Sequence, residues 1–194
     1  MNAPDHQQDP WTKVASLHGF AADELISTLQ KSIRRGLLEN AALVAYEMFA
    51  TSEELEDKAW QRLAVISAED IGFGQPTAPL LIHALDDFRR RIDRSVGDRL
   101  LFLMHAVRVL ATSEKDRTSD ELTTWVRQAV ADGAASPDVF DDALDMHTRR
   151  GQEMGRDFTH FFLNGAQVAN ELPGRDVTYR ERLLARLNLH RAGS

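Results

Sequence analysis

The sequence contains no cysteine among its 194 residues. Disulfide frameworks, thiolate metal sites and cysteine nucleophiles are therefore excluded. No apolar run approaches the roughly 20 residues that a membrane-spanning helix needs. The first eight residues also lack the basic and apolar regions of a secretory signal. We therefore expect no membrane association and a cytoplasmic location.

Patterns typical of β-strands are also missing, because no stretch of four or more residues alternates polar with apolar, β-branched positions. The one dipeptide that could end a P-loop, Lys31-Ser32, follows Gln30 and lacks the glycine-rich loop that wraps phosphates. The nucleophile elbow G-x-S-x-G and the zinc motif H-E-x-x-H do not occur either. We predict that the protein is not an enzyme, with no catalytic residue, cofactor or metal ligand.

Lysine is scarce, since only four of the 23 basic residues are lysine. Arginine favours planar, bidentate contacts at interfaces, and a GC-rich coding bias explains the preference equally well. The net charge of −7 argues against a whole surface that binds nucleic acid non-specifically, although local patches can still be basic. The 43% hydrophobic and 27% charged residues are those of a folded globular protein.

Apolar residues recur at three- and four-residue spacing through most of the chain, which predicts an all-α fold. Helices are expected between Asp23 and Gly36, near 39–50, from 53 to 71, from 79 to 92, near 100–111, after Ser119, after Ser136-Pro137, and over 157–171 and 177–188. We expect a flexible leader over 1–20, held by Trp11, and a single compact, irregular helical bundle over 21–194. A subdivision could fall near 115–136.

Two segments concentrate positive charge. The first spans the end of the fourth expected helix and the next turn, with Arg89, Arg90, Arg91, Arg94 and Arg99. One interpretation is a solvated face that complements the helix dipole, and the alternative is a contact for a partner or nucleic acid. The second segment runs from His147 to Phe162.

This second segment combines Arg149, Arg150 and Arg156 with glycines and phenylalanines. Arginines beside aromatic rings can bind phosphate and stack on bases. The alternative is that the phenylalanines form a core and that the arginines pair with nearby acids, which are Asp141, Asp142 and Asp145.

Glu69 and Asp70 lie near the end of an apolar helix, where the helix dipole disfavours carboxylates. They are either held for a partner arginine, or they form an ion pair or cap that fixes the turn at Gly72 and Gly74. A metal site would need His83 with Asp86 and Asp87, or His147 and His160 with Asp157, to converge with further ligands. Capping or surface histidines are the favoured interpretation.

The order of local motifs resembles one known family. Lys31-Ser32-Ile33-Arg34, with Gly36 and Ala41-Ala42-Leu43, resembles the KSIRGSD..AAL segment of replication-associated recombination AAA+ ATPases (RarA/MgsA type). Arg62-Leu63 with Ser67-Ala68-Glu69-Asp70-Ile71-Gly72 resembles their RRL…ASEDIG signature. Residues 107–115 are similar to their YLA…PKSN region, although Ser113 to Asp116 lack the proline and the Ser-Asn pair. The resemblance spans about residues 22 to 175, without the ATPase module.

The resemblance implies a helical domain like the clamp-loader collar, which mediates oligomerisation of an ATPase that acts at stalled replication forks. We therefore expect an oligomerisation or interaction module, with a second copy or an AAA+ ATPase as partner. Direct DNA binding is the alternative, and a metal-dependent helical enzyme is a third. Candidate contacts to a partner or nucleic acid are Arg34, Arg35, Glu69, Asp70, Arg89, Arg90, Arg91, Arg94, Arg149, Arg150 and Arg156.

Overall fold

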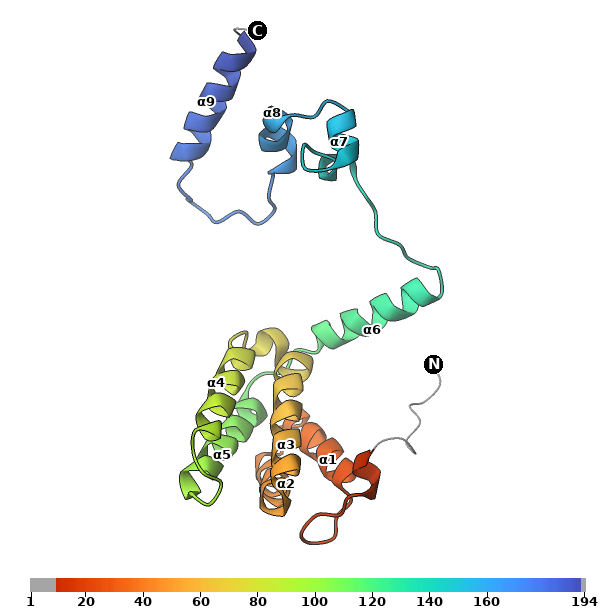
Figure 1. Cartoon of the computed structure of the whole chain (residues 1–194), viewed down its shortest axis with the longest axis vertical. Helices are drawn as coiled ribbons and strands as arrows, with labels where there is room; N and C mark the ends of the chain where they lie inside the picture. Colours follow the sequence, from red (N-terminus) through yellow and green to blue (C-terminus); the bar gives the residue numbers. More distant parts are fainter. Residues whose placement is uncertain (1–9, 193–194) are drawn as a thin grey trace. The chain divides into compact units, whose positions relative to one another are not determined.

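The protein is all-α in the computed structural model, which describes residues 10–192 and, within helix α9, the side chains only as far as residue 187. Over this range no strand forms, and Ala15 and Ala21 make an isolated β-bridge. No helix in the described range is long and apolar enough to cross a bilayer. The chain divides after Ala134 into two compact units, whose helices are labelled in Figure 1.

The first unit contains a helical bundle. Its elements are η2 (Pro10–Lys13), α1 (Ala22–Arg34), α2 (Leu38–Thr51), α3 (Glu53–Ile66), the π-helix η3 (Ser67–Ile71), η4 (Gly72–Gly74), α4 (Ala78–Arg90), α5 (Gly97–Thr112) and α6 (Thr118–Ala131). Helices α1, α2, α3 and α5 contact one another, and α4 packs mainly against α5 and also against α3 (Figure 1).

The core of the first unit follows from the helical periodicity of its sequence. On α1, Leu25, Ile26, Leu29 and Ile33 recur every three or four residues, and all four are buried. Corresponding apolar stripes on α2 to α5 close the core, including Met48, Leu63, Ile82, Leu103 and Leu110. Each of these fully buried aliphatic side chains contributes about 1.5–3 kcal/mol to folding.

Local signals set several helix ends. Gly36 has φ +69°, the left-handed conformation that ends α1 without the steric cost that a Cβ would bring. Ser52 caps α3, because its side chain accepts a hydrogen bond of 3.2 Å from the backbone nitrogen of Leu55. The last turns of this apolar segment widen into the π-helix η3, a form that often occurs at functional sites.

The second unit contains η5 (Asp141–Ala143), α7 (Arg149–Glu153), α8 (Phe158–His160), the π-helix η6 (Phe161–Gly165) and α9 (Thr178–Ala192). Among its described side chains, Leu144 is the one buried hydrophobic residue. This unit therefore has very little apolar core of its own.

The sequence predicted the helices of the first unit well and those of the second less well. The helix expected after Ser136-Pro137 is wrong, because only the three-residue turn Asp141–Ala143 forms there. The helix expected over 157–171 ends at Gly165. Ser119 lies inside α6, whose N-cap is Arg117. Of the expected leader, residues 1–9 lie outside the described residues, and Trp11 packs against the core.

Candidate functional site

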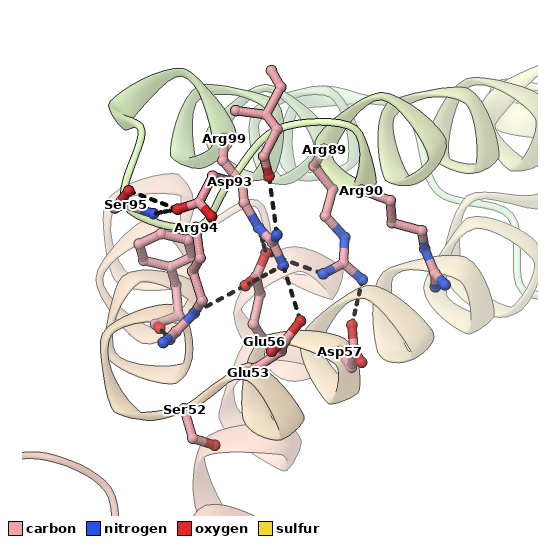
Figure 2. A network of polar contacts seen from close by, with 12 residues as sticks. Ser52, Glu53, Glu56, Asp57, Arg89, Arg90, Asp93, Arg94, Ser95 and Arg99 are labelled. Atoms are coloured by element: carbon pink, nitrogen blue, oxygen red, sulfur yellow. Dashed lines mark hydrogen bonds and ion pairs between the residues drawn. The ribbon is translucent and has the colours of Figure 1, made fainter.

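The arginine cluster at 89–99 surrounds one carboxylate on α3, as Figure 2 shows. Glu56 is fully buried. Arg89 Nη1 donates to its Oε1 at 3.2 Å, and Arg94 Nε donates to its Oε2 at 3.3 Å. Arg99 donates to both oxygens, through Nε at 2.9 Å and Nη2 at 3.0 Å. We call these four residues the Glu56 cluster, which ties α3 to α4, to the following turn and to α5.

Arg89 is 1% exposed and also bonds to two further carboxylates. Its Nε donates to Asp86 at 2.8 Å, and its Nη2 donates to Asp57 at 2.5 Å. Burial alone would lower the pKa of Arg89, but the bonds to Asp57 and Asp86 outweigh burial and raise the pKa above its ordinary value. Arg89 is therefore a charged residue enclosed within the protein.

The other two arginines of the Glu56 cluster also bond inward. Arg94 donates to the backbone carbonyl of Phe49, and Arg99 Nη1 donates to the carbonyl of Ile92 at 3.1 Å. Through these contacts the guanidinium groups donate their hydrogen bonds to acceptors within the protein. Burial of Arg89 and Arg99 departs from the solvated face that the sequence suggested.

Arg90 and Arg91 are the exposed members of the segment, and Arg90 points away from Glu56 in Figure 2. Arg90 Nη2 lies 2.9 Å from Asp86, and Arg91 pairs with Asp87. Both pairs have the i,i+4 spacing of neighbours on one helix face. The structure thus separates the predicted cluster into three arginines that bond to Glu56 and two exposed arginines.

A second polar site lies at η3. Asp70 is fully buried and accepts hydrogen bonds from Gln30 at 3.1 Å, from Arg117 at 2.9 Å and from Arg34. Glu69 lies 2.9 Å from Arg34 and 3.6 Å from Arg117. The hydrogen bond to Asp70 raises the pKa of Arg34 above its ordinary value. We call these five residues the Asp70 junction.

The chain packs tightly against η3 just before α6 begins. A Cβ on Gly72, which has φ +49°, would lie 2.5 Å from the carbonyl oxygen of Asp116. A Cβ on Gly74 would lie 2.4 Å from the carbonyl oxygen of Glu114. The backbone nitrogen of Asp116 donates to the carbonyl of Asp70 at 3.0 Å. Glycine is therefore required at these positions for the close approach of the two backbones.

The Asp70 junction fixes the start of α6, and the apolar face of this helix is exposed to solvent. Arg117, the N-cap of α6, also pairs with Asp120 in the first turn at 2.5 Å. No residue of α6 is buried. The residues of its apolar stripe that are large and exposed are Leu122 at 56%, Trp125 at 59%, Val126 at 43% and Val130 at 57%. The sequence predicts a helix after Ser119, but it carries no signal for what covers this face.

The candidate residues of the second unit are held by local contacts. The side chain of Arg149 is 88% exposed and lies 3.6 Å from Glu153. Arg156 bonds to the carboxylate of Asp141 at 2.6 Å and to the carbonyl of Leu144 at 2.8 Å. Arg150, like Arg35 in the first unit, is exposed.

The three phenylalanines of this segment pack against one another. The ring centroids of Phe158 and Phe162 are 4.6 Å apart, and those of Phe161 and Phe162 are 5.0 Å apart. The ring of His147 makes an edge contact with Phe161 at 5.0 Å. This geometry is that of a small aromatic cluster.

The histidine and carboxylate pairs have other partners. Asp157 caps the backbone nitrogen of His160 at 2.9 Å, and the ring of His147 lies 3.1 Å from Asp145. His83 is exposed, whereas Asp86 bonds to Arg89. In the part of the chain that the structure describes, no three such side chains gather as metal ligands would.

Comparison with known proteins gives no assignment. No known family matches the sequence, and no curated protein matches it.

Proposed function

We propose that this chain is a non-enzymatic assembly module with a collar-like helical fold, related to the C-terminal region of the RarA/MgsA type ATPases. In this proposal it associates with a second copy of itself through the apolar face of α6, and the resemblance suggests a role in DNA replication or recombination. The observation that carries the proposal is the exposure of Leu122, Trp125, Val126 and Val130 on a helix with no buried residue.

The apolar face of α6 would supply part of a dimer interface, but not all of it. Covering the exposed parts of the four side chains would remove roughly 400 Å² of apolar surface per copy from water. Each Å² of apolar surface that is buried contributes about 25 cal/mol to association. Two copies would bury about 800 Å² together, whereas stable interfaces bury about 1,200–2,000 Å². The stripe is uncharged, so a second copy of it meets no like charge, but further surface must take part.

The second unit carries exposed apolar side chains of its own. Phe140 is 62% exposed, Val168 is 67% exposed and Leu172 is 73% exposed. A segment with so little core gains stability when a partner covers its apolar side chains. A second copy supplies such a partner in fixed stoichiometry.

The contacts at η3 support the proposed kinship. Arg34 belongs to the first motif of the resemblance, and Glu69 and Asp70 belong to the second. In the structure Arg34 forms ion pairs with both carboxylates. The third motif leads into Asp116, whose backbone bonds to Asp70. The first two motifs thus meet in the Asp70 junction, and the third ends one residue before the backbone bond to Asp70.

Light scattering coupled to size-exclusion chromatography tests the proposal across a wide range of protein concentration. Wild type should approach twice the 21.8 kDa mass of one chain. Trp125→Glu should be monomeric, because it places a charge at the centre of the apolar stripe. Thr124→Glu, on the opposite face of α6, should stay dimeric. A monomeric wild type at high concentration would refute self-association.

The same measurement bears on the other interpretations. If wild type is monomeric and is retained by a purified AAA+ ATPase, then the face serves that partner instead of a second copy. Direct DNA binding is less well supported, because Arg89, Arg94 and Arg99 direct their donors to Glu56 and to backbone carbonyls.

A further inference from the structure

A polar crevice of about 250 Å³ lies between α1 and α3 beside η2. Its lining includes Trp11, Asp23, Ser27, Gln30, Lys58 and Arg62. It is distinct from the apolar face of α6. Two of its residues, Lys58 and Arg62, are one turn apart on α3, and both bring a positive charge to the lining of the crevice.

These two cations have no carboxylate partner within residues 10–192. The Nζ of Lys58 lies 5.7 Å from the centroid of the Trp11 ring. Arg62 Nη1 donates to Gln30 Oε1 at 3.3 Å. Its Nε is shielded from solvent and makes no hydrogen bond to the described residues. A shielded donor without an acceptor costs stability unless a bound group satisfies it.

Neighbouring hydrogen bonds orient the side chains that line the crevice. The other end of the Gln30 amide donates to Asp70 at 3.1 Å, which directs Oε1 toward Arg62. Gln30 thus positions the guanidinium without offering its own donor. Lys31 Nζ donates to Oγ of the lining residue Ser27 at 2.5 Å, which places a third cation next to that residue. Asp23 is the one acidic residue of the lining.

We propose that this crevice binds the phosphate group of a phosphorylated ligand. The planar fork of Arg62 matches the oxygens of a phosphate, and Lys58 supplies a point charge beside them. A phosphate dianion can accept from several donors at once, which a carboxylate does less well. The crevice is larger than a single ion, so it also admits part of the molecule that carries the phosphate. Unlike the assembly proposal, this inference needs no second chain.

Isothermal titration of the full chain with inorganic phosphate, at low ionic strength, tests the site. Wild type should bind with a saturable isotherm. The double variant Lys58→Gln with Arg62→Gln should lose at least about tenfold in affinity, because it removes two charged donors. The control, Arg108→Gln with Arg127→Gln, removes the same charge from exposed arginines of the first unit and should bind like wild type. Circular dichroism checks folding, and Lys58→Gln alone replaces the double variant if that variant unfolds.

Further ligands identify the source of the phosphate. Tighter binding of a 5′-phosphorylated trinucleotide than of its unphosphorylated form, with a steep dependence on salt, indicates nucleic acid. Tighter binding of a mononucleotide or sugar phosphate indicates a small metabolite. The inference is overturned if phosphate does not saturate, if acetate binds equally well, or if the double variant binds like wild type. Trp125→Glu should bind phosphate normally, so the two proposals fail separately.

Discussion

Removal of the charge on Glu56 should destabilise the first unit more than any substitution at an exposed ion pair. Glu56→Gln keeps the size of the side chain but replaces one acceptor oxygen with an amide donor. That donor would face the guanidinium groups of Arg89 and Arg99, which are 1% and 6% exposed. Two buried cations would then lose the carboxylate that they share.

The magnitude follows from this burial. Breaking a buried ion pair by removing one partner costs about 3–5 kcal/mol, because the remaining charge stays buried without compensation. Asp57 and Asp86 still neutralise Arg89 in part, which places the expected loss near 3 kcal/mol, the lower end of that range of about 3–5 kcal/mol. Asp87→Asn is the control, since it breaks an exposed pair with Arg91 and should cost less than about 1 kcal/mol.

Urea unfolding followed by far-UV circular dichroism and by tryptophan fluorescence measures both variants. The fluorescence of Trp60 is informative, since its ring lies 5.6 Å from the Arg89 guanidinium. An unfolding free energy for Glu56→Gln within about 1 kcal/mol of wild type would refute the reasoning, because it would mean that the cations are hydrated and not buried.

Two further perturbations test other parts of the first unit. Burial alone would raise the pKa of Glu47, but hydrogen bonds with Ser16 and His18 outweigh burial and lower it. This carboxylate therefore stabilises the fold above the ordinary glutamate pKa of about 4.3, and the contribution is lost as the pH falls through the lowered folded value. In a pH series of urea unfolding, the deficit of Glu47→Gln should shrink in acid, and a deficit independent of pH would contradict this. Gly74→Ala should cost about 1–3 kcal/mol, because its Cβ meets a backbone carbonyl at 2.4 Å. A Cβ on Gly97 would meet no atom within 4 Å, so Gly97→Ala should cost nothing. Thermal melts compare the two variants, and equal losses of stability would disprove the packing argument.

The helices of the first unit could be predicted because their apolar residues have a clear period and their ends carry local signals. Gly36 ends α1 as expected, and Ser52 caps the helix that was expected to begin at 53. The second unit shows the limit of such signals. Ser136-Pro137 is a good helix start, but a short helix is not stable without an apolar face to pack on. That face depends on tertiary burial, which local sequence does not encode.

The candidate site shows the same limit. The sequence indicated that Arg89 and its neighbours are unusual, but its partner Glu56 lies 33 positions away. Nothing in the local pattern of α3 marks that carboxylate as buried. The pairing of Arg34 with Asp70 was similarly out of reach, although the position of two carboxylates at a helix end signalled that some cation was needed. The crevice at Lys58 and Arg62 depends on two helices and carried no local signal.

The Glu56 cluster also constrains how this sequence can drift. Loss of Glu56 leaves buried cations without their shared carboxylate. Loss of one arginine leaves the buried carboxylate of Glu56 with fewer hydrogen-bond donors. Replacement of a whole buried ionic group by apolar residues of similar volume, by contrast, is often neutral or stabilising by about 1–4 kcal/mol. The four positions are therefore epistatic. In any set of diverged homologues they should be found either all ionic or all apolar, with few intermediates between the two.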